Sequence, residues 1–358
     1  MITLLLFLLI LGLIVFIHEF GHFIFAKKAG IHVYEFSLGF GPKLFSFHRK
    51  NDETEYMIKL IPLGGYVALA GEEYEDEDNK SDDDKKEKIP EDKKLYNKSF
   101  LRQFSVMVAG VFNNFLLGFI LLLIIGFASK QVAFPTNVLD GMEESFPLYQ
   151  AGARDGQKIV EINSKEVSNI DDIRLRLAIA GDGKTVNITV EDENNNRNTY
   201  KIKPQVLKDD QGKESYFYGI STKVKSGKGI LSTIKFALYK FGFMFKSLVI
   251  TIICLFTGKL GLGSLSGPVG IYSVVGETAK YGVLNLLSLT AYLSINVGFM
   301  NILPFPAFDG GRAFLLIIEK ITKKKVPLKV ETLINNIGFF LLMALMVYVT
   351  IKDILKLI

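Results

Sequence analysis

Four long stretches of the chain are almost entirely apolar, and the charged residues are concentrated in the segments between them. A helix that crosses the hydrocarbon core of a bilayer needs roughly 20 apolar residues, since each residue adds about 1.5 Å of length. The pattern therefore predicts a polytopic α-helical membrane protein. Its four transmembrane helices are expected at residues 1–26, 104–128, 283–305 and 333–351.

A fifth apolar segment, residues 229–257, is less clear. Its uncharged part, SLVITIICLFT, has only eleven residues, and Lys235, Lys240 and Lys246 interrupt the aromatic stretch before it. This mixture is typical of an amphipathic helix in the membrane interface, although partial insertion into the bilayer also fits. We expect residues 206–282 to form an extracytoplasmic or interfacial segment rather than a fifth span.

The polar segment between the first two predicted spans, residues 27–103, has the pattern of strands. YEFSLGFGPKLFSFH and TEYMIKLIPLGGYVAL contain glycine-rich turns and cannot span a membrane, so a β-sheet attached to the membrane face is expected. Residues 72–94 are a run of charged residues with too little apolar surface to fold. We expect a disordered cytoplasmic insertion there.

Residues 130–205 have the composition of a small soluble module. The strand IVEIN follows a turn with Gly152 and Gly156, and an amphipathic stretch, DDIRLRLAIAG, precedes the alternating strand KTVNITVED. This order resembles a PDZ domain, a partly open barrel of α/β type. The resemblance implies an exposed sheet edge that can take up an extended peptide. A generic β-rich spacer is the alternative.

Composition agrees with a membrane protein and disfavours other classes. Hydrophobic residues make up 49% of the 358 residues, and the mean hydropathy is +0.28. The net charge of +5 comes from Lys and Arg scattered through loops, so nucleic acid is not an expected partner. Cys254 is the only cysteine, which leaves no disulfide framework and no thiolate metal cluster.

The distribution of basic residues predicts the orientation in the membrane. Lysine and arginine flank the segment 27–103 and fill the segment 306–332, so the positive-inside rule places both in the cytoplasm. Both termini and residues 129–282 then lie outside. The first apolar stretch is too long for a signal peptide and no basic residue precedes it, so we expect it to stay in the mature protein.

The first predicted span contains the motif His-Glu-x-x-His, made of His18, Glu19 and His22. On a helix the two imidazoles at i and i+4 share one face, as in zinc hydrolases, with the glutamate beside them. A charged carboxylate at this depth costs about 2.5–3.5 kcal/mol unless it faces a polar cavity or a metal. Hydrogen bonding between helices is the alternative role for these residues.

A third metal ligand is needed, because zinc in hydrolases takes three protein ligands and keeps one position open. Pro304 and Pro306 should end the third span, and Asp309 then begins a new helix whose dipole favours the ionised carboxylate. A simple helix cap is the alternative role of this residue. With four spans the first and third helices run in the same direction, which brings Asp309 to the depth of the histidines. A fifth span would place it on the opposite side.

These motifs, in this order, resemble the site-2 protease family of intramembrane zinc metalloproteases, in its bacterial branch with a single PDZ domain. The resemblance rests on HEFGH (18–22), IPLGGYV (61–67), AGVFNNF (109–115), the PDZ-like module, LSGPVGI (265–271) and NILPFPAFDGG (301–311). Two positions depart from the family pattern: Phe308 replaces a leucine and Val111 replaces a proline. Neither is a ligand, so the departures concern packing or substrate fit.

The resemblance implies a zinc-dependent endopeptidase of regulated intramembrane proteolysis in the bacterial cytoplasmic membrane. Its substrates would be single-span membrane proteins, such as anti-sigma factors or signal-peptide remnants, cut after a first extracytoplasmic cleavage. One Zn²⁺ would be held by His18, His22 and Asp309, with Glu19 as the general base. Residues expected to bind substrate or support the site are Asn114, Asn301, Pro304, Pro306, Gly39, Gly41, Gly64 and Gly65.

The resemblance also indicates how a helical substrate is bound. Its backbone carbonyls are hidden in helical hydrogen bonds, so the sheet of residues 32–67 would pair with an unwound stretch, and residues 39–42 would form a flexible turn. The PDZ-like module would face outside and gate access. Two other functions fit the same motifs: a zinc conduit or store, indifferent to the loss of Glu19, and a membrane scaffold without zinc. For Asn114 and Asn301, hydrogen bonding between helices is an alternative to a role in the site.

Overall fold

The structure is a computed structural model that describes residues 2–71, 89–208 and 214–355. The chain forms two compact units, which we call the helical unit (residues 1–125 and 262–358) and the α/β unit (residues 126–261). The elements of the helical unit are α1 (Ile2–Lys28), β1 (Val33–His48), β2 (Glu55–Leu69), η1 (Glu91–Lys93), η2 (Leu95–Asn97), α2 (Phe100–Ala128), η3 (Leu262–Ser264), α6 (Pro268–Ala279), α7 (Val283–Ile302), α8 (Asp309–Thr322) and α9 (Leu328–Leu355). Helix α2 continues a few residues into the α/β unit.

Each of the four predicted spans coincides with a long helix, α1, α2, α7 or α9. The ambiguous fifth segment is also one continuous helix, α5 (Ile230–Phe256). Among the described residues, five helices are therefore long and apolar enough to cross a membrane. The chain is a polytopic membrane protein, but helix length and composition alone do not support four spans over five.

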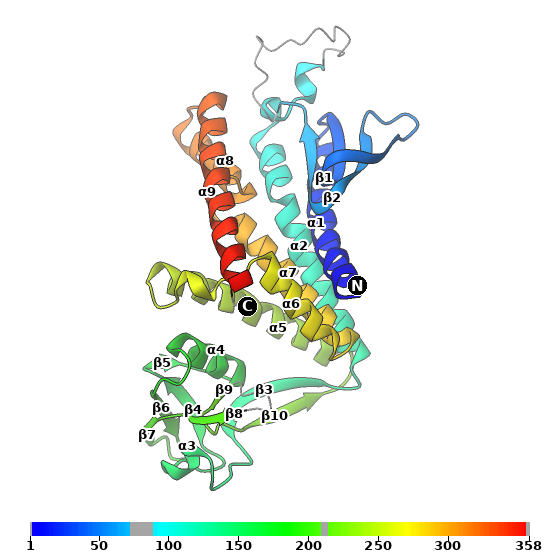
Figure 1. Ribbon diagram of the computed structural model, residues 1–358. Helices are drawn as coiled ribbons and strands as arrows, with labels where there is room; N and C mark the ends of the chain where they lie inside the picture. The colour runs from blue at the N-terminus through cyan, green and yellow to red at the C-terminus, as the bar shows by residue number, and fades with distance from the viewer. Residues whose placement is uncertain (1, 72–88, 209–213, 356–358) are drawn as a thin grey trace. The chain divides into compact units, whose positions relative to one another are not determined.

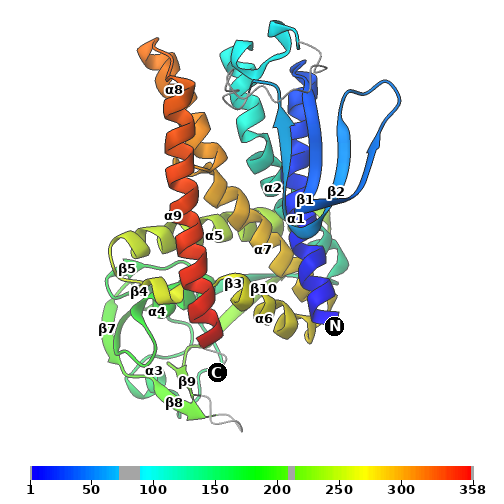
Figure 2. The same ribbon diagram turned by 45° about the horizontal axis from the view of Figure 1, so that its top comes forward.

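Helices α1 and α7 run in the same direction within the helical unit. A buried cluster joins Phe7, Ile10 and Ile14 of α1 to the beginning of α7 at Leu286 and Leu289. At the other end of both helices, His18 and His22 of α1 meet the segment that follows α7. Figures 1 and 2 both show α1 and α7 running in the same direction, with α2 alongside.

The hairpin of β1 and β2 is folded back on itself, so that some segments of its strands pair with a neighbour on both sides. Residues 35–38 pair with 65–68 on one side and with 55–58 on the other, and the far half of β1, residues 43–48, also pairs with 55–59. Gly39 and Gly41 lie at the bend, with φ of +89° and +84°, a region that favours glycine. Residues 65–69 are consequently an edge of the sheet, and they lie beside α1 (Figure 2).

Polar contacts hold the turn of this hairpin to the end of α1. Lys27 Nζ lies 2.7 Å from Asp52 Oδ1 and 2.6 Å from Glu53 Oε1, and the Tyr56 hydroxyl donates to Asp52 at 2.8 Å. Burial raises the pKa of the Asp52 carboxyl, but the hydrogen bonds from Lys27, Tyr56 and the Thr54 N–H outweigh it and hold that pKa well below its usual range.

The beginning of α6 is capped by a side chain from the end of α9. Asp353 is 6% exposed, and its Oδ2 accepts hydrogen bonds from the N–H groups of Gly267 at 2.7 Å and Gly270 at 2.9 Å. A carboxylate is well suited to this position, because the first N–H groups of a helix have no partners within it and carry positive partial charge. Helix α6 in turn packs on α1, where Gly276 lies against Thr3.

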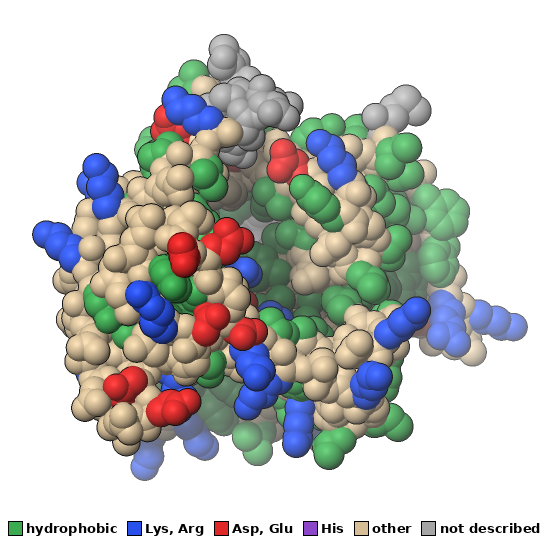
Figure 3. Space-filling model, turned by 90° about the horizontal axis from the view of Figure 1, so that it is seen from below, with side chains coloured by type: hydrophobic (Ala, Val, Ile, Leu, Met, Phe, Trp, Pro, Cys, Tyr) green, Lys and Arg blue, Asp and Glu red, His purple; other side chains and the backbone are tan. Residues whose placement is uncertain are grey.

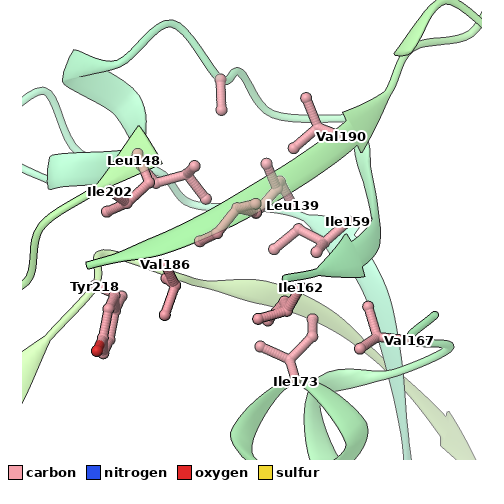
Figure 4. Packing of buried hydrophobic residues seen from close by; sticks show 12 residues of the cluster. Leu139, Leu148, Ile159, Ile162, Val167, Ile173, Val186, Val190, Ile202 and Tyr218 are labelled. Carbon is pink, nitrogen blue, oxygen red and sulfur yellow. The ribbon is translucent and has the colours of Figure 1, made fainter. Parts of the chain in front are cut away.

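The α/β unit has an antiparallel sheet with one helix on it. Its elements are β3 (Val132–Leu139), α3 (Pro147–Gln150), β4 (Lys158–Ile162), β5 (Lys165–Glu166), α4 (Ile170–Ala180), β6 (Val186–Glu191), β7 (Arg197–Ile202), β8 (Gln205–Lys208), β9 (Glu214–Phe217), β10 (Thr222–Gly227) and α5. The strand order is β10-β3-β4-β6-β7. Leu139, Ile159 and Val186 of the strands form a core with Ile173 of α4 (Figure 4).

The strand order bears on the predicted boundary of this unit and on its sheet edges. The strands continue to Gly227, beyond the predicted boundary at residue 205, because β10 returns to pair with β3. This pairing also covers the outer edge of β3 along residues 132–139, so that edge is not exposed for an added peptide. Strand β7 is the edge at the other end of the sheet.

The charged segments differ in part from expectation. Residues 72–88 of the predicted disordered insertion lie outside the described residues, whereas residues 91–93 form the short helix η1, so the C-terminal end of the predicted range differs from the structure. The His32 N–H donates to the Lys93 carbonyl at 3.0 Å and anchors this turn. On the face shown in Figure 3, acidic and basic side chains are interspersed rather than gathered into one basic surface.

Candidate metal centre

Three potential metal ligands, distant in sequence, converge in the helical unit. The Nε2 atoms of His18 and His22 are 3.4 Å apart, and each lies 3.1 Å from Oδ2 of Asp309. This is the one cluster of His, Cys, Asp or Glu with metal-ligand spacing that the described residues contain. The structure therefore brings together the two histidines of the motif and the predicted third ligand.

The spacing and chemistry of these atoms fit zinc. Ligand atoms at about 2.0–2.1 Å from a tetrahedral zinc ion lie roughly 3.3 Å from one another, which agrees with the separations of 3.1–3.4 Å found here. Two imidazole nitrogens and one carboxylate oxygen are a donor set of catalytic zinc sites, where a fourth position stays open.

The backbone of α2 orients the second imidazole. Nδ1–H of His22 donates to the Val106 carbonyl at 2.8 Å, which leaves the Nε2 lone pair directed at the cluster. Helices α1 and α2 can approach this closely only through glycine. A Cβ added at Gly21 would lie 2.5 Å from the Ala109 carbonyl oxygen, and one added at Gly110 would lie 2.4 Å from Nε2 of His22.

A tight turn after α7 positions Asp309. Ala307 has φ of +70°, an unusual value for a residue with a side chain, and Asp309 is the first residue of α8. Gly310 and Gly311 let the turn close, since added Cβ atoms would lie 2.3 Å from the Ile302 carbonyl oxygen and 2.4 Å from that of Phe305. Pro304 and Pro306 of the motif lie in this turn, between the end of α7 and the beginning of α8.

The cluster opens into a cavity of about 150 Å³. Glu19 lines it next to the histidines, and the sheet edge at residues 65–69 contributes Gly65, Tyr66, Val67 and Leu69. Gly65 gives Glu19 its space, because a Cβ at this position would lie 3.0 Å from Cγ of Glu19. The carboxyl group beside the ligands and the sheet edge thus border the same cavity.

The remaining predicted residues take different places. Asn114 of α2 lies beside His18, with 3.2 Å between its Nδ2 and the imidazole Nδ1. Asn301 is in the last turn of α7, and the described residues show no hydrogen bond from it to the three ligands. Of the four glycines in the sheet, Gly65 lines the cavity. The other three glycines, Gly39, Gly41 and Gly64, lie within β1 and β2 with positive φ. Pro304 and Pro306 lie in the turn between α7 and α8.

Some residues of the site were not predicted. Tyr66 and Arg312 line the cavity, and the Val106 carbonyl holds His22. Val106, Gly110 and Asn114 are four residues apart along α2, so a search for positions on one helix face would have connected the first with the others. Arg312 stands one turn after Asp309, the same kind of signal.

Two imidazole nitrogens and one carboxylate oxygen that converge among the helices of a membrane protein are the ligand set expected of a membrane-embedded metallohydrolase. Comparison with known proteins defines the family: the profile of peptidase family M50 matches residues 6–345. The chain belongs to peptidase family M50, the site-2 proteases, and is an intramembrane zinc metalloprotease.

Similar proteins carry the words zinc metalloprotease in their names. A relative from Clostridium acetobutylicum is 35% identical over 97% of this chain and 96% of its own length. One from Staphylococcus aureus strain COL is 32% identical over 99% of this chain and 98% of its own length. The zinc metalloprotease RasP of Bacillus licheniformis is 31% identical, with 99% of both chains covered. The similarity extends over the metal centre and the α/β unit alike.

Proposed function

We propose that one zinc ion per chain is held by His18, His22 and Asp309, and that Glu19 is the general base of peptide hydrolysis. The observation that carries this proposal is the triangle of three ligand atoms with sides of 3.1–3.4 Å. Zinc bound there supplies a Lewis acid that polarises the scissile carbonyl and acidifies water. Glu19 takes the proton of the attacking water and delivers it to the leaving amine.

The test combines metal analysis with cleavage of a single-span reporter in detergent or liposomes. The wild type should hold one zinc and cut the reporter, whereas Glu19→Gln should keep the zinc and lose cleavage. His22→Ala should lose both. Zinc bound in full by His22→Ala would contradict the ligand assignment, and cleavage by Glu19→Gln would contradict the general base. The same pair separates the protease from a zinc conduit, which would not need Glu19.

We further propose that the unwound stretch of the substrate pairs with the sheet edge at residues 65–69. This edge borders the cavity that contains Glu19, whereas residues 55–58 pair on both sides and cannot accept another strand. Prolines in the interior segment, residues 56–60, would therefore test the stability of the sheet and not substrate pairing.

Prolines at Tyr66 and Val67, introduced one at a time, make a sharper experiment. Successive N–H groups of an edge strand alternate between the sheet and the open side, so one variant removes an internal bond and the other removes a donor to the substrate. Substrate pairing predicts that the variant which keeps wild-type thermal stability still loses most cleavage. If that stable variant cleaves like the wild type, strand pairing at this edge is wrong.

Four transmembrane spans, with α5 outside the bilayer core, are proposed on two observations. First, α1 and α7 run in the same direction, so an odd number of crossings must lie between them. Helix α2 alone satisfies this condition, whereas α2 and α5 together do not. Second, within the α/β unit, Lys240 and Lys246 of α5 bind Asp171 at 2.8 Å and Asp172 at 2.7 Å, both on α4. A helix that is paired in this way with a polar module is suited to the membrane surface.

Orientation can be measured because the chain has one native cysteine. In a Cys254→Ser background, single cysteines at Asn194 and Lys228 should react with an impermeant thiol reagent from outside, and one at Lys325 only from inside. This result would agree with both termini outside and a metal centre in the cytoplasmic half of a bacterial cytoplasmic membrane. Labelling of positions 228 and 325 from the same side would exclude the four-span arrangement.

The proposed substrates are single-span membrane proteins from which a first protease has removed the outer domain. We propose that the α/β unit is a PDZ domain and that it excludes substrates that have not been trimmed. Because Val132 of β3 pairs with Gly227 of β10, the two ends of residues 132–227 are adjacent, and a short linker can replace this segment. Such exclusion predicts that this deletion accelerates cleavage of untrimmed reporters relative to trimmed ones. An unchanged preference for trimmed reporters would contradict it.

A further inference from the structure

Asn114 is a fully buried polar residue at the contact of α1, α2 and α7. Its exposed fraction is 0%. Its backbone carbonyl accepts a hydrogen bond from the Ser294 hydroxyl of α7 at 2.8 Å, and Gly298 of α7 lies close enough that an added Cβ would be 3.3 Å from Cβ of Asn114. The helix is therefore fixed here by its backbone, and the side chain is left to act on its other neighbour, His18.

The carboxamide has one end at the imidazole and one end without a partner. Nδ2 lies 3.2 Å from Nδ1 of His18, while Oδ1 is the one buried side-chain N or O atom of the described residues that has no hydrogen-bond partner. The amide O and N are nearly equivalent in shape, so rotation about the Cβ–Cγ bond exchanges them. The orientation of the amide therefore depends on whether Nδ1 of His18 donates or accepts, because the opposite end of the amide has no hydrogen-bond partner.

The tautomer of His18 sets this choice. When Nε2 carries the proton, it donates to Asp309, and Nδ1 accepts from the Asn114 amino group, which agrees with the 3.1 Å and 3.2 Å distances between these atoms. A neutral imidazole that binds a metal through Nε2 has its proton on Nδ1, which becomes a donor. A donor cannot face the amino group, so the oxygen must turn toward it.

We propose that Asn114 is a positioning residue whose Oδ1 accepts the Nδ1–H of His18 and so fixes this ligand in its metal-binding tautomer. The Val106 carbonyl makes the same contact with His22. Outer contacts of this kind typically contribute 10–100-fold to metal affinity. The inference rests on the proposed zinc site and goes beyond it, since it assigns a role to a residue that is not a ligand.

The test measures zinc affinity of the purified full chain by competition with a chelator. Asn114→Leu keeps the size of the side chain and removes the acceptor, and should bind zinc 10–100-fold more weakly. Asn114→Asp keeps an acceptor oxygen toward His18 and should stay within about threefold of the wild type. The matched control is Asn113→Leu, because Asn113 donates to the Ile17 carbonyl at 3.2 Å and not to a ligand. It should also stay within about threefold.

Each outcome decides between packing and hydrogen bonding. Thermal unfolding of the metal-free variants in detergent shows whether they fold, and Asn114→Asp serves as the folded variant if Asn114→Leu does not. Equal affinity for Asn114→Leu and Asn113→Leu, or an equal loss for Asn114→Asp and Asn114→Leu, would overturn the inference. Failure of the zinc site itself would look different. In that case the wild type would bind no zinc, or His22→Ala would bind as much zinc as the wild type.

Discussion

Gly110 of α2 lies directly against both histidine rings, so a single methyl group there should displace these proposed metal ligands. An added Cβ would be 2.4 Å from Nε2 of His22 and 2.7 Å from Cε1 of His18. Favourable carbon contacts begin near about 3.5 Å, which makes the overlap with His22 roughly 1 Å. Both rings face α2, and Gly21 of α1 lies against the Ala109 carbonyl, so the two helices are in direct contact at this level and leave little room for an added methyl group.

The expected effect of Gly110→Ala is loss of function in a well-folded protein. Displacement of catalytic groups by about 1 Å can reduce a rate on the order of 100-fold, and we expect at least this loss in reporter cleavage together with weaker zinc binding, about tenfold or more. Alanine is favoured over glycine inside a helix by about 1 kcal/mol, so the helix itself gains stability.

The assay is zinc competition and reporter cleavage on purified protein, with Gly12→Ala as the matched control. Gly12 lies in α1, and an added Cβ there would meet nothing within 4 Å. The control gains the same helix propensity without touching the site, and it should cleave and bind zinc like the wild type. Wild-type zinc affinity and cleavage in Gly110→Ala would refute the reasoning, because it would mean that the rings do not lie where the structure places them.

The remaining predictions concern the other polar groups. Glu19→Gln should lower cleavage on the order of 100–10,000-fold at unchanged zinc content, measured by reporter turnover and metal analysis. Asp309→Asn should lose most zinc, seen as a lower metal content. Because the pKa of Asp52 is depressed in the folded protein, its ion pair with Lys27 contributes stability above the ordinary carboxyl pKa of about 3.9 and loses it as pH falls. The Lys27→Met variant should therefore be less stable than the wild type at pH 7, and this difference should shrink as the pH falls below about 4, as measured by thermal unfolding. A difference that is the same at both pH values would be contrary evidence.

Several features could be predicted from sequence because they depend on local pattern. Twenty apolar residues in a row specify a long helix, and the His-Glu-x-x-His spacing fixes which ring faces share a side. Asp309 was accessible through topology: once the first and third helices run the same way, its depth follows. The number of transmembrane spans could not be decided from local pattern. Lysines of α5 form ion pairs with Asp171 and Asp172, and the sequence does not show that these residues lie together.

Other features depend on contacts between distant residues, and the sequence does not specify them. Hydrophobic alternation identifies β1 and β2 but not the folding back that makes residues 65–69 an edge. Likewise, β10 covers the edge of β3 from more than 80 positions away along the chain. Asn113 and Asn114 are indistinguishable in sequence, yet a rotation of about 100° per residue directs one to a backbone carbonyl and the other to His18.

The cap that Asp353 places on α6 extends the influence of the chain's far end to its first helix. Helix α6 contacts α1, the helix that carries both histidines, so the last turn of α9 is linked to α1 through two packing interfaces. Loss of this carboxylate, as in Asp353→Ala, would therefore leave the first N–H groups of α6 without their cap and loosen a helix that packs on α1.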